Sequence, residues 1–310
     1  MHCCVTGGSG FIGHHLVRIL DGQGKTLTVI GRNRLPSRTL PSGVRYIAGD
    51  YGDHYFLRGV LNDVDEIIDL AYASVPKTSF EDPVKDILNN LPPSVNLFEV
   101  ASSLPIKKIV IVSSGGTVYG RAVDLPISED HPTDPISPYG ITKLAVEKYA
   151  RMYHALKGLP VVCVRPANAF GEGQKPFIGQ GFVATAIASA LEGREINIFG
   201  EQGTIRDLVY VKDVAAGIAA ALNHCPPGEC YNIGSGIGRN NLEILEMLAA
   251  IAKSRDIVLR VKVLPSRLYD VPANVLDSSK LQNKTGWFPK VSLMKGLELT
   301  WKYFEEHYNQ

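Results

Sequence analysis

The sequence predicts an α/β protein built on a doubly wound, mostly parallel sheet, with a smaller α/β part at its C-terminal end. Two observations predict this class: short β-rich runs alternate with amphipathic helical patterns through the first half, and a glycine-rich turn follows the first of these runs. A third observation is length. At 310 residues the chain is roughly twice a typical domain, so we expect one large domain or two closely packed ones.

The strands and helices of the first half alternate strictly. The β-rich runs predict strands at His2–Thr6, Leu27–Gly31, Val44–Ala48, Glu66–Leu70, Lys108–Ser113 and Pro160–Arg165. The amphipathic stretches between them predict helices at Phe11–Asp21, Asp53–Val60, Pro83–Ser103 and Pro138–Lys157. Such alternation places helices on both faces of a parallel sheet. Because Pro92-Pro93 interrupts the third helix, a kink or a restart is expected there.

The pattern changes after Pro166. A glycine-rich loop is expected at Gly171–Gly181 and a strand near Ile257–Val263. Helices are predicted at Phe182–Glu192, at Lys212–Leu222 after the run Val209–Val211, near Asn241–Lys253 and near Leu293–Glu306. We therefore expect one domain over residues 1–170, to which a segment near 205–225 returns, and a second domain over residues 171–310. Because ligands of open α/β sheets bind at the carboxyl ends of the strands, the second domain should lie over that edge.

Composition excludes several other classes of protein. Apolar residues make up 45% and charged residues 20%, which argues against disorder, and a formal charge of +1 gives no reason to expect a nucleic-acid or membrane partner. Five cysteines without framework spacing indicate reduced thiols; Cys225 and Cys230 could be half of a metal site, but they have no second pair, so no metal is expected. No apolar run approaches the roughly 20 residues of a membrane span, and the glycine-rich turn comes too early for a signal peptide. We expect a soluble, cytoplasmic enzyme.

The turn between the first strand and the first helix carries the first chemical signal. Gly7, Gly10 and Gly13 have the spacing G-x-x-G-x-x-G, and the helix opens with Phe11-Ile12. Glycine allows a tight turn and close approach of the backbone to a diphosphate, while the helix N-terminus offers free N–H groups and a positive dipole end. A tight turn without a ligand is the alternative. Strand, turn and helix in this order favour a Rossmann-type dinucleotide site.

The end of the second strand bears on the choice of dinucleotide. A carboxylate at this position bonds the ribose hydroxyls of NAD and repels the 2′-phosphate of NADP. This chain has Gly31 followed by Arg32 and Asn33, and a guanidinium here could pair with a 2′-phosphate; NAD is favoured and NADP stays open. Asp50, after the third strand, is expected to accept a bond from the adenine amino group, to cap the next helix, or to do both.

A Y-x-x-x-K motif opens the helix predicted at Pro138–Lys157. Ser137 suits the N-cap and Pro138 the first turn, so Tyr139 and Lys143, four residues apart, lie on one face. A lysine ammonium near a phenol favours the phenolate, and the phenol can then act as acid and base. Because a free phenol titrates near 10, such chemistry at neutral pH requires a shift of about 3 units.

Hydroxyl groups gather at the end of the strand that precedes this helix. Ser113, Ser114 and Thr117 follow the run of apolar residues, and hydroxyls at the carboxyl edge of a sheet point into its cleft. They are expected to polarise a reacting alcohol or ketone, although some of them could cap the loop backbone instead.

Together these motifs resemble the extended short-chain dehydrogenase/reductases of the nucleotide-sugar epimerase/dehydratase family. The resemblance covers nearly the whole chain in the family's order, with further matches at Arg165-Pro166-Ala167-Asn168, Gly200–Asp207, Val211–Val214 and Arg267–Pro272. It implies an NAD-dependent enzyme, similar to UDP-glucose 4-epimerase, that acts on nucleotide-diphosphate sugars. It also implies a homodimer, paired through the helices at 83–103 and 138–157.

The resemblance assigns catalytic roles as well. Tyr139 would be the acid/base and Lys143 its partner, bonded to the nicotinamide ribose. Many 4-epimerases carry a serine or threonine where this chain has Gly115, so Thr117 or Ser114, or a water molecule, must hold the sugar hydroxyl here, and Thr117 is preferred.

Binding residues follow from the same resemblance. The cofactor would be held by Gly7, Gly10, Phe11, Ile12, Gly13, Arg32, Asn33, Asp50, Tyr51, Leu70, Ala71, Ala73, Ser113, Tyr139, Lys143 and Pro166. Asn168, Arg206 and Arg267 would hold the substrate's diphosphate, since two guanidiniums suit a dianion. The alternative is that Arg206 pairs with Asp207, and Arg267 with Asp270.

The implied reaction is the 4-epimerisation of a UDP-hexose through a transient 4-keto sugar. An NADP-dependent 4-ketoreductase is the alternative, and a catalytically silent binding protein is disfavoured by the intact Tyr139 and Lys143. A dehydratase is disfavoured because Gly115-Gly116 offers no acidic side chain. Asn274, small where some relatives have tyrosine, is expected to leave room for an N-acetyl group, so that UDP-GlcNAc/UDP-GalNAc would be accepted as well as UDP-Glc/UDP-Gal; otherwise Asn274 only satisfies loop backbone.

Overall fold

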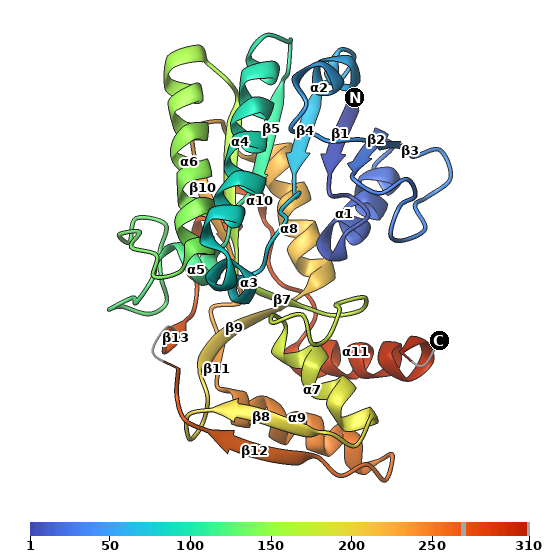
Figure 1. The fold of residues 1–310 in the computed structure, drawn as a ribbon, viewed down its shortest axis with the longest axis vertical. Coiled ribbons are helices and arrows are strands. Elements are labelled where there is room, and N and C mark those ends of the chain that lie inside the picture. Colours follow the sequence, from blue (N-terminus) through green and yellow to red (C-terminus); the bar gives the residue numbers. More distant parts are fainter. Residues whose placement is uncertain (268–270, 309–310) are drawn as a thin grey trace.

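The fold is organised around a seven-stranded parallel sheet, seen in a computed structural model that describes residues 1–267 and 271–308 (Figure 1). The strands lie in the order β10-β6-β5-β4-β1-β2-β3. Their bounds are β1 (His2–Thr6), β2 (Thr26–Gly31), β3 (Arg45–Ala48), β4 (Glu66–Asp69), β5 (Lys108–Val112), β6 (Val161–Pro166) and β10 (Cys230–Ile233). The predicted fold class is confirmed.

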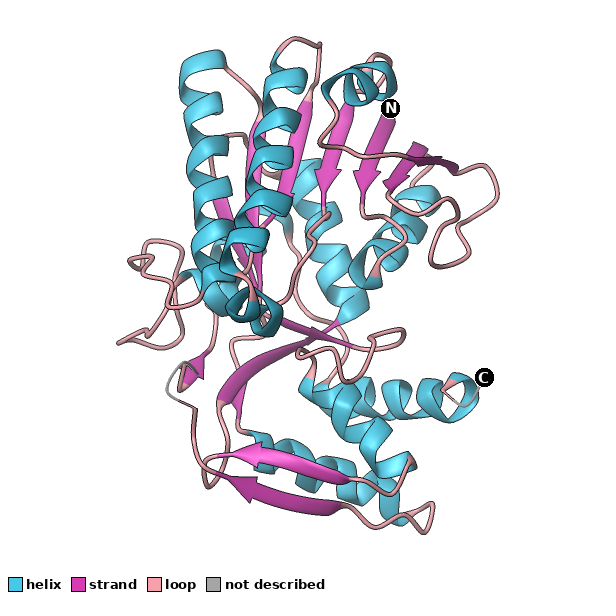
Figure 2. Ribbon diagram, viewed as in Figure 1, coloured by secondary structure: helices cyan, strands magenta, loops and turns pink. Residues whose placement is uncertain are grey.

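Helices cover both faces of this sheet (Figure 2). On one face, α4 (Pro83–Ser102) packs between α2 (His54–Leu61) and α6 (Pro138–Lys157). On the other, α8 (Val211–His224) packs between α1 (Phe11–Gly22) and α10 (Ser279–Thr285). Each face has its own apolar core, the first around Leu57 and Phe98 and the second around Leu16 and Leu222, all of them almost fully buried. Burial of these side chains on both sides is what stabilises the layered arrangement.

Some of the elements that sequence patterns miss are very short. The strand β10 has four residues and follows a Pro-Pro-Gly turn, while α3 (Pro76–Glu81) and α5 (Gly115–Val118) are one or two turns long. None of them is long enough to show a helical or a strand period. The position of β10 is set by its backbone pairing with β6, in which Cys230 lies opposite Cys163.

The sequence predicts a kink or a restart at Pro92-Pro93. The structure has no restart there, because α4 is one helix from Pro83 to Ser102. Two prolines inside a helix leave the carbonyl groups four residues earlier, those of Leu88 and Asn89, without their usual donors. Both residues are exposed, so water can bond these carbonyls. The helix therefore continues past the prolines.

A smaller part lies below the carboxyl edge of the sheet (Figure 1). Its central strand β9 (Ile205–Tyr210) pairs with β7 (Asn168–Phe170), β11 (Gly238–Arg239) and β13 (Ala273–Asn274), and β8 (Glu195–Phe199) pairs with β12 (Arg260–Leu264). The helices α7 (Phe182–Leu191), α9 (Asn241–Lys253) and α11 (Leu293–His307) share a third apolar core, which includes Leu248 and Trp301.

The strand order of the large sheet reverses at β1. β1 pairs with β2 on one side and with β4 on the other. Loops that leave the carboxyl ends of two such neighbouring strands separate and open a crevice, the usual ligand site of this architecture. Among the helices of the described residues, none has the length and apolar character that a membrane span requires.

Candidate functional site

A cleft of about 1440 Å³ opens at this point between the sheet and the smaller part. Its walls come from the carboxyl ends of the strands, from the loop around residues 171–181 and from β9. Every predicted cofactor residue and every predicted catalytic residue lines it, and so do Asn168, Arg206 and Arg267. Asn274 is the one predicted site residue that does not.

The glycine turn forms the floor of the cleft at the start of α1. Gly7 has a φ of +66°, which glycine adopts readily, and the Gly10 amide donates to the Gly7 carbonyl over 2.9 Å. A Cβ atom at Gly13 would overlap that same carbonyl oxygen, so only glycine fits there. Among residues 1–267 and 271–308, no side chain caps the first turn of α1. Its N–H groups are thus open to a diphosphate, and the turn fits a dinucleotide.

At the end of β2, the cleft wall leaves no space for a side chain at Gly31. A Cβ atom at Gly31 would overlap the hydroxyl of Tyr46, which donates to the Asn33 carbonyl over 2.7 Å. An acidic side chain has no space at this position unless Tyr46 moves. Arg32 and Asn33, both exposed, line the cleft beside it.

Asp50 lies in the cleft but does not cap the next helix. Its carboxylate accepts from the Gly52 amide over 2.9 Å, whereas α2 is capped by Asp53, which accepts from the amides of Tyr55 and Phe56. The expected capping role of Asp50 is therefore wrong. Its position in the cleft wall is compatible with the expected contact to adenine.

The Y-x-x-x-K pair is held as the spacing predicts. The Ser137 side chain accepts from the Gly140 amide and starts α6, so Tyr139 and Lys143 face the cleft from its first two turns. Lys143 is 7% exposed, and its Nζ donates to the Val112 carbonyl over 2.8 Å. Burial lowers the pKa of Lys143 to about 8. Burial also raises the pKa of Tyr139, and the nearby Asp86 carboxylate raises it further.

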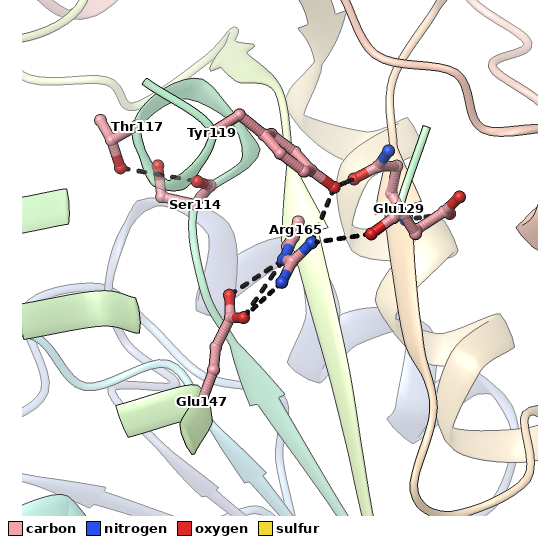
Figure 3. A network of polar contacts seen from close by, with 7 residues as sticks. Ser114, Thr117, Tyr119, Glu129, Glu147 and Arg165 are labelled. Atoms are coloured by element: carbon pink, nitrogen blue, oxygen red, sulfur yellow. Dashed lines mark hydrogen bonds and ion pairs between the residues drawn. The ribbon is translucent and has the colours of Figure 1, made fainter. Parts of the chain in front are cut away.

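The hydroxyls after β5 reach the same place. A hydrogen bond from Ser114 lowers the pKa of Tyr139, which puts Ser114 next to the phenol. Thr117, whose hydroxyl lies 3.5 Å from the Ser114 carbonyl, also lines the cleft (Figure 3). The buried Ser113 hydroxyl has no hydrogen-bond partner in the described part of the chain, an arrangement that fits a polar ligand group. Gly115 is explained by packing, because a Cβ atom there would overlap the Leu276 side chain.

Behind these hydroxyls lies a buried charge network that the sequence patterns did not reveal (Figure 3). Arg165 of β6 donates to Glu147 of α6 over 2.6 and 3.1 Å and to the Tyr119 hydroxyl over 2.9 Å. The side chains of Arg165 and Glu147 are each 8% exposed. The network joins α6 to the strand end behind the Ser114 and Thr117 hydroxyls. The sequence signal that could have revealed this network is the position of Glu147, one turn after Lys143 on the same helix face.

The far half of the cleft is basic. Arg206 lines it from β9. Asp207 is fully buried and accepts from the Ser235 amide over 2.9 Å. The two side chains therefore lie on different faces of β9. The Arg267 guanidinium stacks on the Phe199 ring, 3.2 Å from its centroid. The alternative partner of Arg267, Asp270, lies outside the described residues together with Leu268 and Tyr269.

Arg239 joins this basic wall and was not predicted. It lies directly opposite Arg206 in the antiparallel pair of β11 and β9, lines the cleft, and pairs with Glu243 over 3.0 Å. Like charges placed opposite one another on two strands repel, and a bound anion relieves that repulsion. The wall fits a diphosphate.

Two predicted features lie away from the cleft. Asn274 is 1% exposed and its amide donates to the Gly115 carbonyl over 2.9 Å, so it holds loop backbone behind the site. All five cysteines are free. Cys230 lies with Cys163 and Glu147, their ligand atoms within 4.8 Å of one another, and Cys225 is not part of that group.

Fold and site together define the class of protein. One side of the cleft has the turn, the polar wall and the Tyr139–Lys143 pair, an arrangement that suits a nicotinamide dinucleotide. The opposite side has the arginines that suit a diphosphate-linked substrate. This is the arrangement of an NAD-dependent enzyme that acts on a nucleotide sugar.

Comparison with known proteins identifies the family. The model of the NAD dependent epimerase/dehydratase family matches residues 3–234. The UDP-glucose 4-epimerase of Mycolicibacterium smegmatis is 34% identical over 98% of this chain and 98% of its own. The chain belongs to the NAD dependent epimerase/dehydratase family, as an enzyme of the nucleotide-sugar epimerase kind.

Solved structures agree with this assignment. The UDP-glucose 4-epimerase of Thermotoga maritima, determined with UDP-glucose, superposes with a TM-score of 0.92 at 33% identity, covering 99% of this chain and 100% of its own. That of Thermus thermophilus, determined with NAD, gives a TM-score of 0.91 at 32% identity with the same coverage.

Proposed function

We propose that the protein is a UDP-hexose 4-epimerase that acts through transient oxidation at C4 of the sugar. The observation that carries the proposal is the juxtaposition in one cleft of the Tyr139 phenol and the Ser114 and Thr117 hydroxyls with the arginines of the far wall. The two UDP-glucose 4-epimerases compared above in structure share the fold over the whole chain, which supports the same conclusion.

The residues divide the chemistry between them. The turn with Gly7, Gly10 and Gly13 would hold NAD, which would supply the hydride acceptor and donor for C4 of the sugar. Tyr139 removes the proton of the 4-hydroxyl and later gives it back, while Ser114 or Thr117 donates a hydrogen bond to the same oxygen. Because burial raises the pKa of Tyr139, the positive charge of Lys143 is needed to favour the phenolate. Arg206 and Arg267 hold the diphosphate while the sugar turns.

Two measurements test the proposal. Mass spectrometry of the purified protein should find retained NAD, because an epimerase returns its hydride and need not exchange the cofactor. Incubation with UDP-glucose should give UDP-galactose without added reductant. Empty protein that takes up NADPH and reduces a 4-keto sugar would instead establish the alternative, a ketoreductase. Loss of water from the sugar would establish a dehydratase, which Gly115-Gly116 disfavours.

The choice between NAD and NADP is tested at Arg32. Arg32→Glu should weaken NADPH binding at least tenfold, about 1.4 kcal/mol, and spare NADH if the guanidinium pairs with a 2′-phosphate. A modest figure is expected because Arg32 is exposed and solvent screens the pair. The control is Arg34→Glu, also exposed but outside the cleft. Equal changes for the two cofactors, measured by calorimetry, would remove the case for NADP.

The finer substrate choice remains part of the proposal. Acceptance of UDP-GlcNAc/UDP-GalNAc was expected because Asn274 is small. Because Asn274 is buried outside the cleft and its amide is bonded to the Gly115 carbonyl, its position supports the alternative that it only satisfies loop backbone. Both sugar pairs should therefore be assayed side by side with the wild-type enzyme.

We also propose a homodimer formed through α4 and α6. The two helices pack side by side and expose a group of large apolar side chains: Val84, Ile87, Leu88, Ile141, Tyr149, Met152 and Leu156. An apolar surface of this kind on two adjacent helices favours a second copy of the chain. Light scattering on the purified protein should give twice the mass of the chain.

A further inference from the structure

One aromatic ring contacts both members of the Y-x-x-x-K pair and belongs to neither motif. Tyr72 follows β4 and lines the cleft. The Lys143 ammonium lies over the face of the Tyr72 ring, 4.0 Å from its centroid, and the Tyr139 ring meets it edge to face at 4.8 Å. The Tyr72 hydroxyl lies 3.5 Å from the Tyr139 carbonyl.

The ammonium is thus enclosed by two groups. The Val112 carbonyl accepts from Lys143 at 2.8 Å, and the face of the Tyr72 ring lies 4.0 Å from the same nitrogen. The ring of Tyr139 is farther away, with its centroid 5.9 Å from the same nitrogen. Because Lys143 is 7% exposed, little water competes, and a cation–π contact is strongest when it is desolvated.

We propose that Tyr72 is a positioning residue for Lys143: the face of its ring holds the ammonium in the cleft wall, one helical turn from Tyr139. The inference rests on the proposed function only for the role of Tyr139. The contact itself is a property of the folded chain, and it can be tested without a substrate.

The contact has a consequence for protonation. Burial lowers the pKa of Lys143, and four nearby groups raise it: Asp69, Cys163, Glu147 and Asp86. Burial outweighs them, and the pKa of Lys143 is about 8. These groups come from β4, α4, α6 and β6. The π-electrons of Tyr72 add a further attraction for the charged form. Removing the ring while keeping its volume should therefore lower the pKa of Lys143, and the ammonium would be lost at a lower pH.

The test is competitive acetylation of Lys143 with acetic anhydride across a range of pH, read by mass spectrometry of the peptide that contains it. The cofactor content of the wild-type and variant proteins is measured and matched. Tyr72→Phe keeps the ring and should leave the titration midpoint within about 0.3 pH unit. Tyr72→Met and Tyr72→Leu lose the ring, and each should lower the midpoint by about one unit, a tenfold change in acid dissociation constant.

The control is Tyr55→Leu, which removes a tyrosine ring that is 86% exposed and should leave the midpoint unchanged. An unshifted midpoint in the Met and Leu variants would overturn the proposal, and so would an equal shift in Tyr72→Phe. Thermal melting identifies a variant that does not fold, in which case the other ringless variant decides. If UDP-sugars are not converted at all, the proposed function fails while the labelling result still decides the role of Tyr72.

Discussion

Tyr139→Phe is expected to lower turnover of the UDP-hexose by about 10²–10⁴-fold and to leave cofactor affinity nearly unchanged. The substitution removes only the phenolic oxygen, the atom that would accept and return the substrate's proton. The ring itself, packed edge to face on Tyr72 at 4.8 Å, is kept, so the cleft should retain its shape. Steady-state kinetics with UDP-glucose and calorimetric titration with NAD measure the two effects separately.

The matched control lies on the same helix. Tyr149→Phe removes a hydroxyl from a side chain that is 40% exposed and outside the cleft, and its activity should equal that of the wild type. Activity of Tyr139→Phe within a few-fold of the wild type would contradict the assignment of Tyr139 as the acid/base. Loss of activity together with loss of cofactor would indicate a structural role instead.

Glu147→Leu is expected to lower the free energy of unfolding by about 3–5 kcal/mol. The carboxylate is the charged partner of Arg165, with both side chains 8% exposed, and its removal leaves a buried guanidinium without a counter-charge. The loss should show in urea denaturation as a lower midpoint with an unchanged slope.

Two comparisons separate this charge effect from a packing defect. Adding Arg165→Met should recover part of the loss, because a buried pair replaced by apolar groups is often neutral in stability. Glu298→Ala breaks the exposed pair with Lys295, whose side chains are 48% and 61% exposed, and should cost less than about 1 kcal/mol. A loss below 1 kcal/mol for Glu147→Leu would show that Arg165 finds another counter-charge.

Local sequence patterns determined the parallel sheet, the glycine turn and α6, the helix that carries Tyr139 and Lys143. In each case the chemistry acts within a few residues: Gly13 must leave room for the Gly7 carbonyl, and Ser137 starts α6 so that Tyr139 and Lys143 share one face. The arrangement of strands then brings their carboxyl ends together. For this reason one cleft brings together the predicted residues of the glycine turn, the strand ends and α6.

Contacts between residues distant in sequence were decided only by the tertiary structure. Leu276 fills the space beside Gly115, and Asn274 lies behind the cleft because it bonds the Gly115 carbonyl. Likewise, Arg165 meets Glu147, and Tyr72 meets Lys143, only after the sheet and helices have packed. No periodicity or spacing records such pairs, since each side chain's partner is selected by packing and by the need to satisfy buried polar groups.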